Sequence, residues 1–224
     1  MATWMVHLRI ADKLLDKISC LSGTEFIVGN IAPDSGIPNE DWSVFTPSGN
    51  LSHFKTTDAD GFKDIHIGEY VEQYYSLEQR KKYNEKQKSF YLGYLSHLLT
   101  DMMWSNLVVR PSKDKFKSLY DHDWNEWIWT LKRDWYDLDF LYLKRNPDFR
   151  AFSIYKEAVG FHNDFIDFFS ADAFDNRREY ITSFYSEVRD NIEREYNYLN
   201  EIEMAQFVEE TVKRIYISIT EDYL

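Results

Sequence analysis

The sequence has few of the residues that cross-link a chain or turn it sharply. One of its 224 residues is a cysteine, Cys20, so no intrachain disulfide can form. Glycine and proline number 8 and 5, too few for the tight turns of an all-β sandwich. No window approaches about 18 uninterrupted apolar residues, and the first residues lack a secretory-signal pattern. These absences favour a helical, cytoplasmic protein without stable membrane insertion.

Positive charge is also scarce. The 26 Lys and Arg residues face 38 Asp and Glu, which gives a net charge of −12. This balance argues against a broad basic surface for long nucleic acid and against unaided docking on anionic membranes. It is compatible with a metal site, because bound cations neutralise buried carboxylates.

Aromatic residues are abundant, with 7 Trp, 16 Tyr and 16 Phe, and hydrophobic residues make up 44% of the chain. A sizeable core is therefore expected, and Tyr and Trp suit the lining of a pocket because a ring packs while its polar end meets a partner. We see no internal repeat, low-complexity tract or linker. One domain spanning residues 1–224 is the simplest interpretation.

Helical periodicity covers most of the sequence, with expected helices at 4–20, 77–109, 114–144 (with a break near 121), 149–159, 173–199 and 201–224. Pro111 should end the second helix, and Pro33 should hold Ala32 outside the helical region and leave Asp34 on a turn. Residues 38–68 read as a long irregular loop, packed by its aromatics (Trp42, Phe45, Phe54, Phe62). The predicted fold is all-α: a single-domain helical bundle with long central helices and a long ordered loop.

The central segment, residues 91–104, is almost wholly apolar but contains His97 and Asp101. Their i,i+4 spacing places both side chains on one helix face, where they can share a metal ion. A core histidine bonded to its neighbour would give the same pattern. His122 and Glu126 form a second pair with this spacing.

Three further residues, His7, Asp34 and His53, lie on other expected segments. Each has an ordinary interpretation: a half-buried histidine at a helix start, a turn aspartate and a surface histidine. Together with the i,i+4 pairs they would supply imidazoles and carboxylates from separate elements, as a metal site in a helical bundle requires. Such ligands suit zinc, with iron or manganese as alternatives in a site richer in oxygen.

Two of these segments resemble motifs of a known family. Residues 29–34 read Gly-Asn-Ile-Ala-Pro-Asp, and residues 93–104 read Gly-Tyr-Leu-Ser-His-Leu-Leu-Thr-Asp-Met-Met-Trp. They resemble the Gly-x-x-Ala-Pro-Asp and Gly-Tyr-x-x-His-Leu-x-x-Asp-x-x-Trp motifs of the zinc-dependent phospholipase C family, which shares its fold with the P1/S1 nucleases. The resemblance covers about residues 1–130.

The resemblance implies a set of metal ligands. One ion would be held by Asp34, His53, His97 and Asp101, and a neighbouring ion would share Asp101 and use His7. Asp34 would also orient or deprotonate the attacking water. The family's further ion would use the pair His122 and Glu126, but residues 105–107 lack the histidine that completes that site, so a third ion should be weak or absent.

The resemblance also implies a function. The chain is expected to be a metal-dependent hydrolase that activates water on a small or lipid-derived phosphodiester. Secreted members use the amino group of an N-terminal Trp as a ligand, whereas Trp4 is not terminal here. Two alternatives stay open: a non-catalytic helical binding protein that retains the fold, and a P1-like nuclease that reads short single strands by stacking on aromatics.

Overall fold

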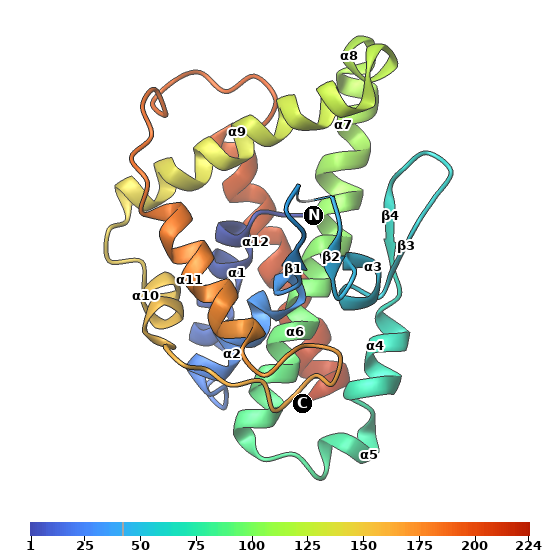
Figure 1. The fold of residues 1–224 in the computed structure, drawn as a ribbon, viewed down its shortest axis with the longest axis vertical. Coiled ribbons are helices and arrows are strands. Elements are labelled where there is room, and N and C mark those ends of the chain that lie inside the picture. Colours follow the sequence, from blue (N-terminus) through green and yellow to red (C-terminus); the bar gives the residue numbers. More distant parts are fainter. Residues whose placement is uncertain (42) are drawn as a thin grey trace.

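The computed structural model describes residues 1–41 and 43–224, and helices dominate it (Figure 1). The predicted all-α class is confirmed. The α-helices are α1 (Trp4–Lys17), α2 (Gly23–Ile31), α3 (Gly49–Ser52), α4 (Ile67–Tyr74), α5 (Leu77–Arg80), α6 (Glu85–Trp104), α7 (Arg110–Lys115), α8 (Lys117–His122), α9 (Trp124–Arg145), α10 (Arg150–Glu157), α11 (Ala173–Tyr185) and α12 (Glu201–Ser218).

Helix α6 is the central element, and α1, α2, α4 and α12 pack around it (Figure 1). It begins at a capping box in which Asn84 and Gln87 satisfy each other's backbone N–H groups. From Ser89 onward nearly every side chain is buried. An apolar surface on all sides is typical of a helix enclosed by others, so the sequence predicts its central position correctly.

Two glycines allow α2 and α6 to touch backbone to backbone. A Cβ atom at Gly29 would lie 2.1 Å from the Phe90 carbonyl oxygen, and one at Gly93 would lie 2.2 Å from the Phe26 carbonyl oxygen. No other residue fits at either position without moving a helix. This contact fixes the register between the α2 segment that leads to Asp34 and the α6 segment that carries His97.

The segment before Asp34 differs from the prediction. The sequence predicts that Ala32 lies outside the helical region and that Asp34 lies on a turn. In the structure, α2 extends to Ile31 and continues as the 3₁₀ helix η1 (Ala32–Asp34). Ala32 has helical dihedral angles, φ −51° and ψ −39°, so the restriction before Pro33 is overridden. Proline is tolerated there because the first turn of a helix needs no N–H from it.

The expected helix at 77–109 is divided in the structure. The short α5 is separated from α6, and α6 passes through the π-helical turn η2 (Ser105–Val109) into α7. Pro111 does not end this helical stretch, because it lies in the first turn of α7. The next expected helix does break, at Asp123, whose side chain caps α9.

The C-terminal third also departs from the prediction. The expected helix at 173–199 ends as α11 at Tyr185, and residues 186–200 form an irregular segment. Arg194 holds this segment against α9, at 2.8 Å from Asp134 and 2.7 Å from Asp137. These tertiary contacts replace helical hydrogen bonds. Helix α12 and the π-helical turn η3 (Ile219–Tyr223) complete the chain.

The long loop at 38–68 contains regular structure that the sequence analysis missed. Strand β1 (Ile37–Pro38) pairs with β2 (Phe45–Thr46), and β3 (Lys55–Thr57) pairs with β4 (Lys63–Ile65), both antiparallel. The loop is packed as expected, because Phe54 and Phe62 are buried. Trp42, expected to help pack it, lies outside the described residues.

Candidate metal centre

Five side chains from four segments meet beside the middle of α6. His7 comes from the second turn of α1, Asp34 from the end of η1, His53 from the C-terminus of α3, and His97 and Asp101 from α6. The two histidines of α1 and α6 and Asp101 are fully buried, and His53 nearly so. The Asp34 side chain is 15% exposed, so it marks the side of the cluster that reaches solvent.

The nitrogen and oxygen atoms of the cluster lie within a few ångströms of one another. Asp101 Oδ1 is 3.3 Å from His7 Nε2, and Asp101 Oδ2 is 3.3 Å from His97 Nε2 and 3.8 Å from His53 Nε2. Asp34 Oδ1 is 3.1 Å from His53 Nε2. Two overlapping groups could each hold an ion: His7, Asp34 and His97, and His53, His97 and Asp101.

Backbone carbonyls fix the orientation of two of the imidazoles. His97 Nδ1 lies 2.7 Å from the Asn30 carbonyl oxygen, and His53 Nδ1 lies 3.1 Å from the Gly49 carbonyl oxygen. A carbonyl can only accept, so in each ring Nδ1 donates and the Nε2 lone pair is directed inward. These two Nε2 atoms are only 3.2 Å apart, an electron-rich arrangement that a shared cation would stabilise.

The surroundings of His7 also favour a bound cation. Its ring stacks on His97 with centroids 3.7 Å apart and planes within 2°. Among the described residues, neither His7 nitrogen nor Asp101 Oδ2 has a hydrogen-bond partner of acceptable geometry, although all three atoms are buried. Buried polar atoms are almost always satisfied. Buried nitrogen and oxygen atoms without a partner fit a zinc ion, which accepts both donor types.

The electrostatics keep most of the cluster in its metal-binding form. Burial raises the pKa of Asp101 and of Asp34, but the adjacent imidazoles outweigh burial, and both pKa values fall below the usual range. Burial lowers the pKa of His7 and lowers that of His53 to about 4. For His97, burial is outweighed by the charge of Asp101, and its pKa is raised.

A second layer of hydrogen bonds holds the N-terminal segment against the cluster. The Ala2 backbone N–H donates to Asp101 Oδ1 at 2.8 Å. The Thr3 hydroxyl donates to Asp139 Oδ1 at 2.8 Å, and the Tyr185 hydroxyl donates to Asp139 Oδ2 at 2.7 Å. The sequence analysis missed this layer and the Asn30 carbonyl. Asn30 lies inside the 29–34 motif, but nothing in the sequence marks Asp139.

The second predicted pair lies elsewhere on the molecule. His122 Nδ1 is 3.1 Å from Glu126 Oε2, and the two side chains are 75% and 56% exposed. Neither residue belongs to the two metal-capable groups of the described chain. The structure therefore brings together five of the seven predicted ligands, and a third ion at His122 and Glu126 stays a prediction.

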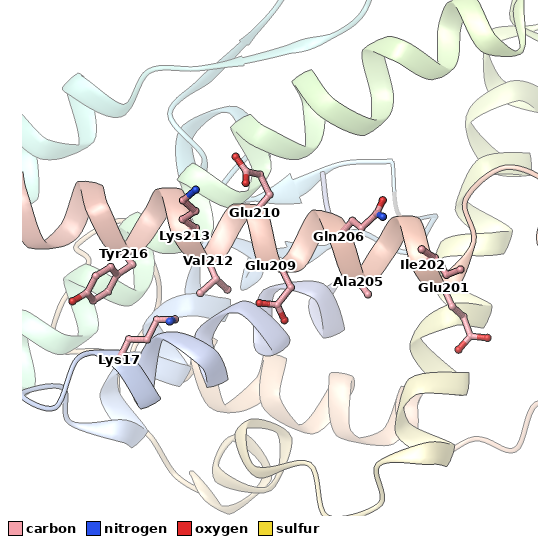
Figure 2. Close-up of a pocket in the computed structure, with 10 residues that line it drawn as sticks. All are labelled: Lys17, Glu201, Ile202, Ala205, Gln206, Glu209, Glu210, Val212, Lys213 and Tyr216. Atoms are coloured by element: carbon pink, nitrogen blue, oxygen red, sulfur yellow. The ribbon is translucent and has the colours of Figure 1, made fainter.

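A groove on the described surface is separate from this cluster. It runs along α12 beside the end of α1, and its lining includes Lys17, Glu209, Lys213 and Tyr216 (Figure 2). Its lining contains none of the five clustered residues. Its charged rim and lack of converging metal ligands make it a poor candidate for the site of chemistry.

The comparisons with known proteins agree with the cluster. The family model of zinc dependent phospholipase C matches residues 6–215, well beyond the segment that the motifs alone cover. The chain therefore belongs to the zinc dependent phospholipase C family, and family and cluster together define a metal-dependent, phospholipase-like hydrolase. Searches of curated proteins and of solved structures found no match. No helix of the described chain is both long and apolar enough to span a membrane.

Proposed function

We propose that this protein hydrolyses a phosphodiester, in a small or lipid-derived substrate, at a zinc centre built by His7, Asp34, His53, His97 and Asp101. The observation that carries the proposal is the convergence of these five side chains, with buried nitrogen and oxygen atoms left unpaired. Asp101 supports two ions rather than one, because its Oδ1 lies 3.3 Å from His7 Nε2 and its Oδ2 lies 3.3 Å from His97 Nε2, so each oxygen could serve a different ion. Zinc in such a centre would polarise the phosphoryl oxygens and make a bound water acidic.

Each residue has a separate task in this proposal. Asp101, buried and ionised, would bridge the two ions, and the three imidazoles would present Nε2 lone pairs. Asp34 is the ligand that reaches solvent, and its lowered pKa leaves it ionised at neutral pH. It can therefore accept a hydrogen bond or a proton from the attacking water. Its Oδ1 lies 3.1 Å from His53 Nε2, so one ion could bind both atoms.

The first experiment is the zinc content of the purified protein beside an Asp101→Asn variant. Asparagine keeps the shape of the side chain and removes its charge. We expect two equivalents of zinc in the wild type, a loss of at least one in the variant, and zinc-dependent hydrolysis of bis(p-nitrophenyl) phosphate in the wild type alone. The matched control is Asp121→Asn, which removes an exposed carboxylate paired with Lys117 and should leave both results unchanged.

Two results would contradict the proposal. A wild-type protein that binds no metal, even after reconstitution, would mean that the cluster is only structural. Full zinc occupancy without hydrolysis of any phosphodiester would favour a binding protein that retains the family fold. Circular dichroism of the variant separates loss of metal from loss of folding.

A further inference from the structure

His53 is attached to a much shorter helix than the other histidines of the cluster. His7 lies in the 14-residue helix α1, and His97 lies with Asp101 in the 20-residue helix α6. His53 directly follows α3, which has four residues. A helix this short is not stable by itself, so α3 cannot hold the imidazole in place. The position of His53 must be set by contacts with other parts of the molecule.

Tyr94 supplies one of these contacts from α6. Its hydroxyl donates a hydrogen bond to the carbonyl oxygen of Ser52, the last residue of α3. The last carbonyls of a helix have no partner within the helix, and Ser52 is buried, so solvent is a poor substitute for this donor. Tyr94 is itself fully buried and lies one turn before His97. The helix that carries His97 therefore also holds the backbone next to His53.

The residue on the other side of His53 is attached to the same aromatic rings. Phe54 has a φ of +48°, a left-handed conformation that is uncommon for a bulky residue and persists only where surrounding contacts maintain it. Its ring lies edge-on to that of Tyr70, with centroids 5.4 Å apart and planes at 75°. Tyr70 in turn stacks on Tyr94, with centroids 4.9 Å apart and planes at 5°. Both neighbours of His53 are thus held by the Tyr70–Tyr94 pair.

This attachment controls the distance from His53 to the other candidate ligands. His53 Nε2 lies 3.2 Å from His97 Nε2 and 3.1 Å from Asp34 Oδ1. An ion held by these atoms needs each of them within about 0.5 Å of the correct position. A shift of α3 away from α6 would carry His53 Nε2 out of that range, and the hydrogen bond from Tyr94 to the end of α3 opposes such a shift.

We propose that Tyr94 is a positioning residue of the metal centre: its hydroxyl holds the end of α3 so that His53 Nε2 reaches the ion shared with Asp34 and His97. The inference rests on the proposed function and adds to it a residue that does not itself bind metal. Groups that orient a metal ligand contribute about 10- to 100-fold to metal affinity. Removing the hydroxyl should therefore weaken the ion bound by His53 and leave an ion bound by His7 in place.

The test compares Tyr94→Phe with Tyr70→Phe. Each substitution keeps a ring of the stack and removes one buried hydroxyl, but the Tyr70 hydroxyl donates to the Tyr91 carbonyl oxygen of α6, at 2.8 Å, and not to α3. Both variants should therefore lose similar stability. In a competition titration against a chromophoric zinc chelator, wild type and Tyr70→Phe should bind two equivalents with the same affinities. In Tyr94→Phe the dissociation constant of one equivalent should rise about tenfold or more.

Further measurements separate positioning from a general structural effect. The visible absorption of bound cobalt(II) depends on the geometry of its ligands, so the spectrum should change in Tyr94→Phe and stay as in the wild type in Tyr70→Phe. Because Tyr94 acts through His53, Tyr94→Phe should cause no further loss of affinity in a His53→Ala background. Phe54→Leu, which reduces the contact with the Tyr70 ring, should weaken the same ion, and it keeps the test decisive if Tyr94→Phe does not fold.

The outcomes distinguish the inference from the function on which it rests. If Tyr94→Phe has the zinc affinities and cobalt spectrum of the wild type, the role of Tyr94 is overturned and the metal centre stands. Equal weakening in Tyr94→Phe and Tyr70→Phe, or an additive loss in the double variant with His53→Ala, would also overturn it, because the effect would then not pass through His53. A wild type that binds no zinc would overturn the proposed function, and the inference with it.

Discussion

Asp139 offers the sharpest quantitative test of the structure. Its side chain is buried in α9 between the Thr3 and Tyr185 hydroxyls. Burial raises its pKa to about 7, because the two hydrogen bonds and the charges of Arg9 and Arg189 compensate only in part for lost hydration. Asp139 in the folded protein therefore stays protonated at pH values at which an aspartate in solvent is already ionised.

The magnitude follows from the two pKa values. The pKa is about 7 in the folded state and 3.8 in the unfolded state, and each unit corresponds to ~1.4 kcal/mol. The unfolded chain releases its proton first as pH rises, so the stabilisation is complete below the unfolded pKa and is lost as pH rises through the folded pKa. The total loss is ~4 kcal/mol, of which ~2.5 kcal/mol falls between about pH 5 and 8.

The assay is urea unfolding of the wild type and Asp139→Asn across that pH range. The uncharged asparagine keeps the size of the side chain and does not titrate, so subtraction cancels every other titrating group, including those of the metal centre. The free energy of unfolding of the variant relative to the wild type should increase by ~2.5 kcal/mol from about pH 5 to 8. A constant difference would refute the reasoning. Asp121→Asn, at an exposed position, is the control.

Three further changes test other parts of the structure. Gly93→Ala should lower the free energy of unfolding by about 3 kcal/mol or more in urea, because the new Cβ would lie 2.2 Å from the Phe26 carbonyl oxygen. Gly68→Ala is the control and should not destabilise the protein, because its Cβ would meet no atom within 4 Å. Equal effects of the two substitutions would disprove the close contact at Gly93. His122→Ala should leave the metal of the buried cluster in place, and loss of that metal would contradict the exposed placement of His122. Chelation should lower the melting temperature of the wild type by more than that of Asp101→Asn, because the variant holds fewer stabilising ions; an equal decrease would point to metal bound elsewhere.

The part of the site that depends on local geometry could be predicted from the sequence. The i,i+4 spacing of His97 and Asp101 already places them on one helix face, and the structure holds their atoms 3.3 Å apart. That His7, Asp34 and His53 join them depends on tertiary packing, for which spacing contains no information. The same spacing in His122 and Glu126 produced an exposed pair, so the pattern alone does not identify a site.

The fold class was predictable, but several element boundaries were not. Pro33 and Pro111 each lie in the first turn of a helical segment, where proline is tolerated. The first residue of each of these segments could not be located from the sequence alone. Residues 186–200 have helical periodicity, yet Arg194 binds carboxylates of α9 instead. Such contacts join residues about 60 positions apart and override local propensity.

The unequal exposure of the candidate ligands has a consequence for how quickly metal would exchange. Asp34, at 15% exposed, is the ligand nearest solvent, and the rings of His7 and His97 lie at the enclosed end. An ion leaving the enclosed end must wait for the segment carrying Asp34 or His53 to move, because α1, α2 and α6 are packed too closely to part without unfolding. Release of any bound metal should therefore be limited by local opening of the segments that carry Asp34 and His53, and not by global unfolding. The centre would then exchange its metal from one side while the rest of the protein stays folded.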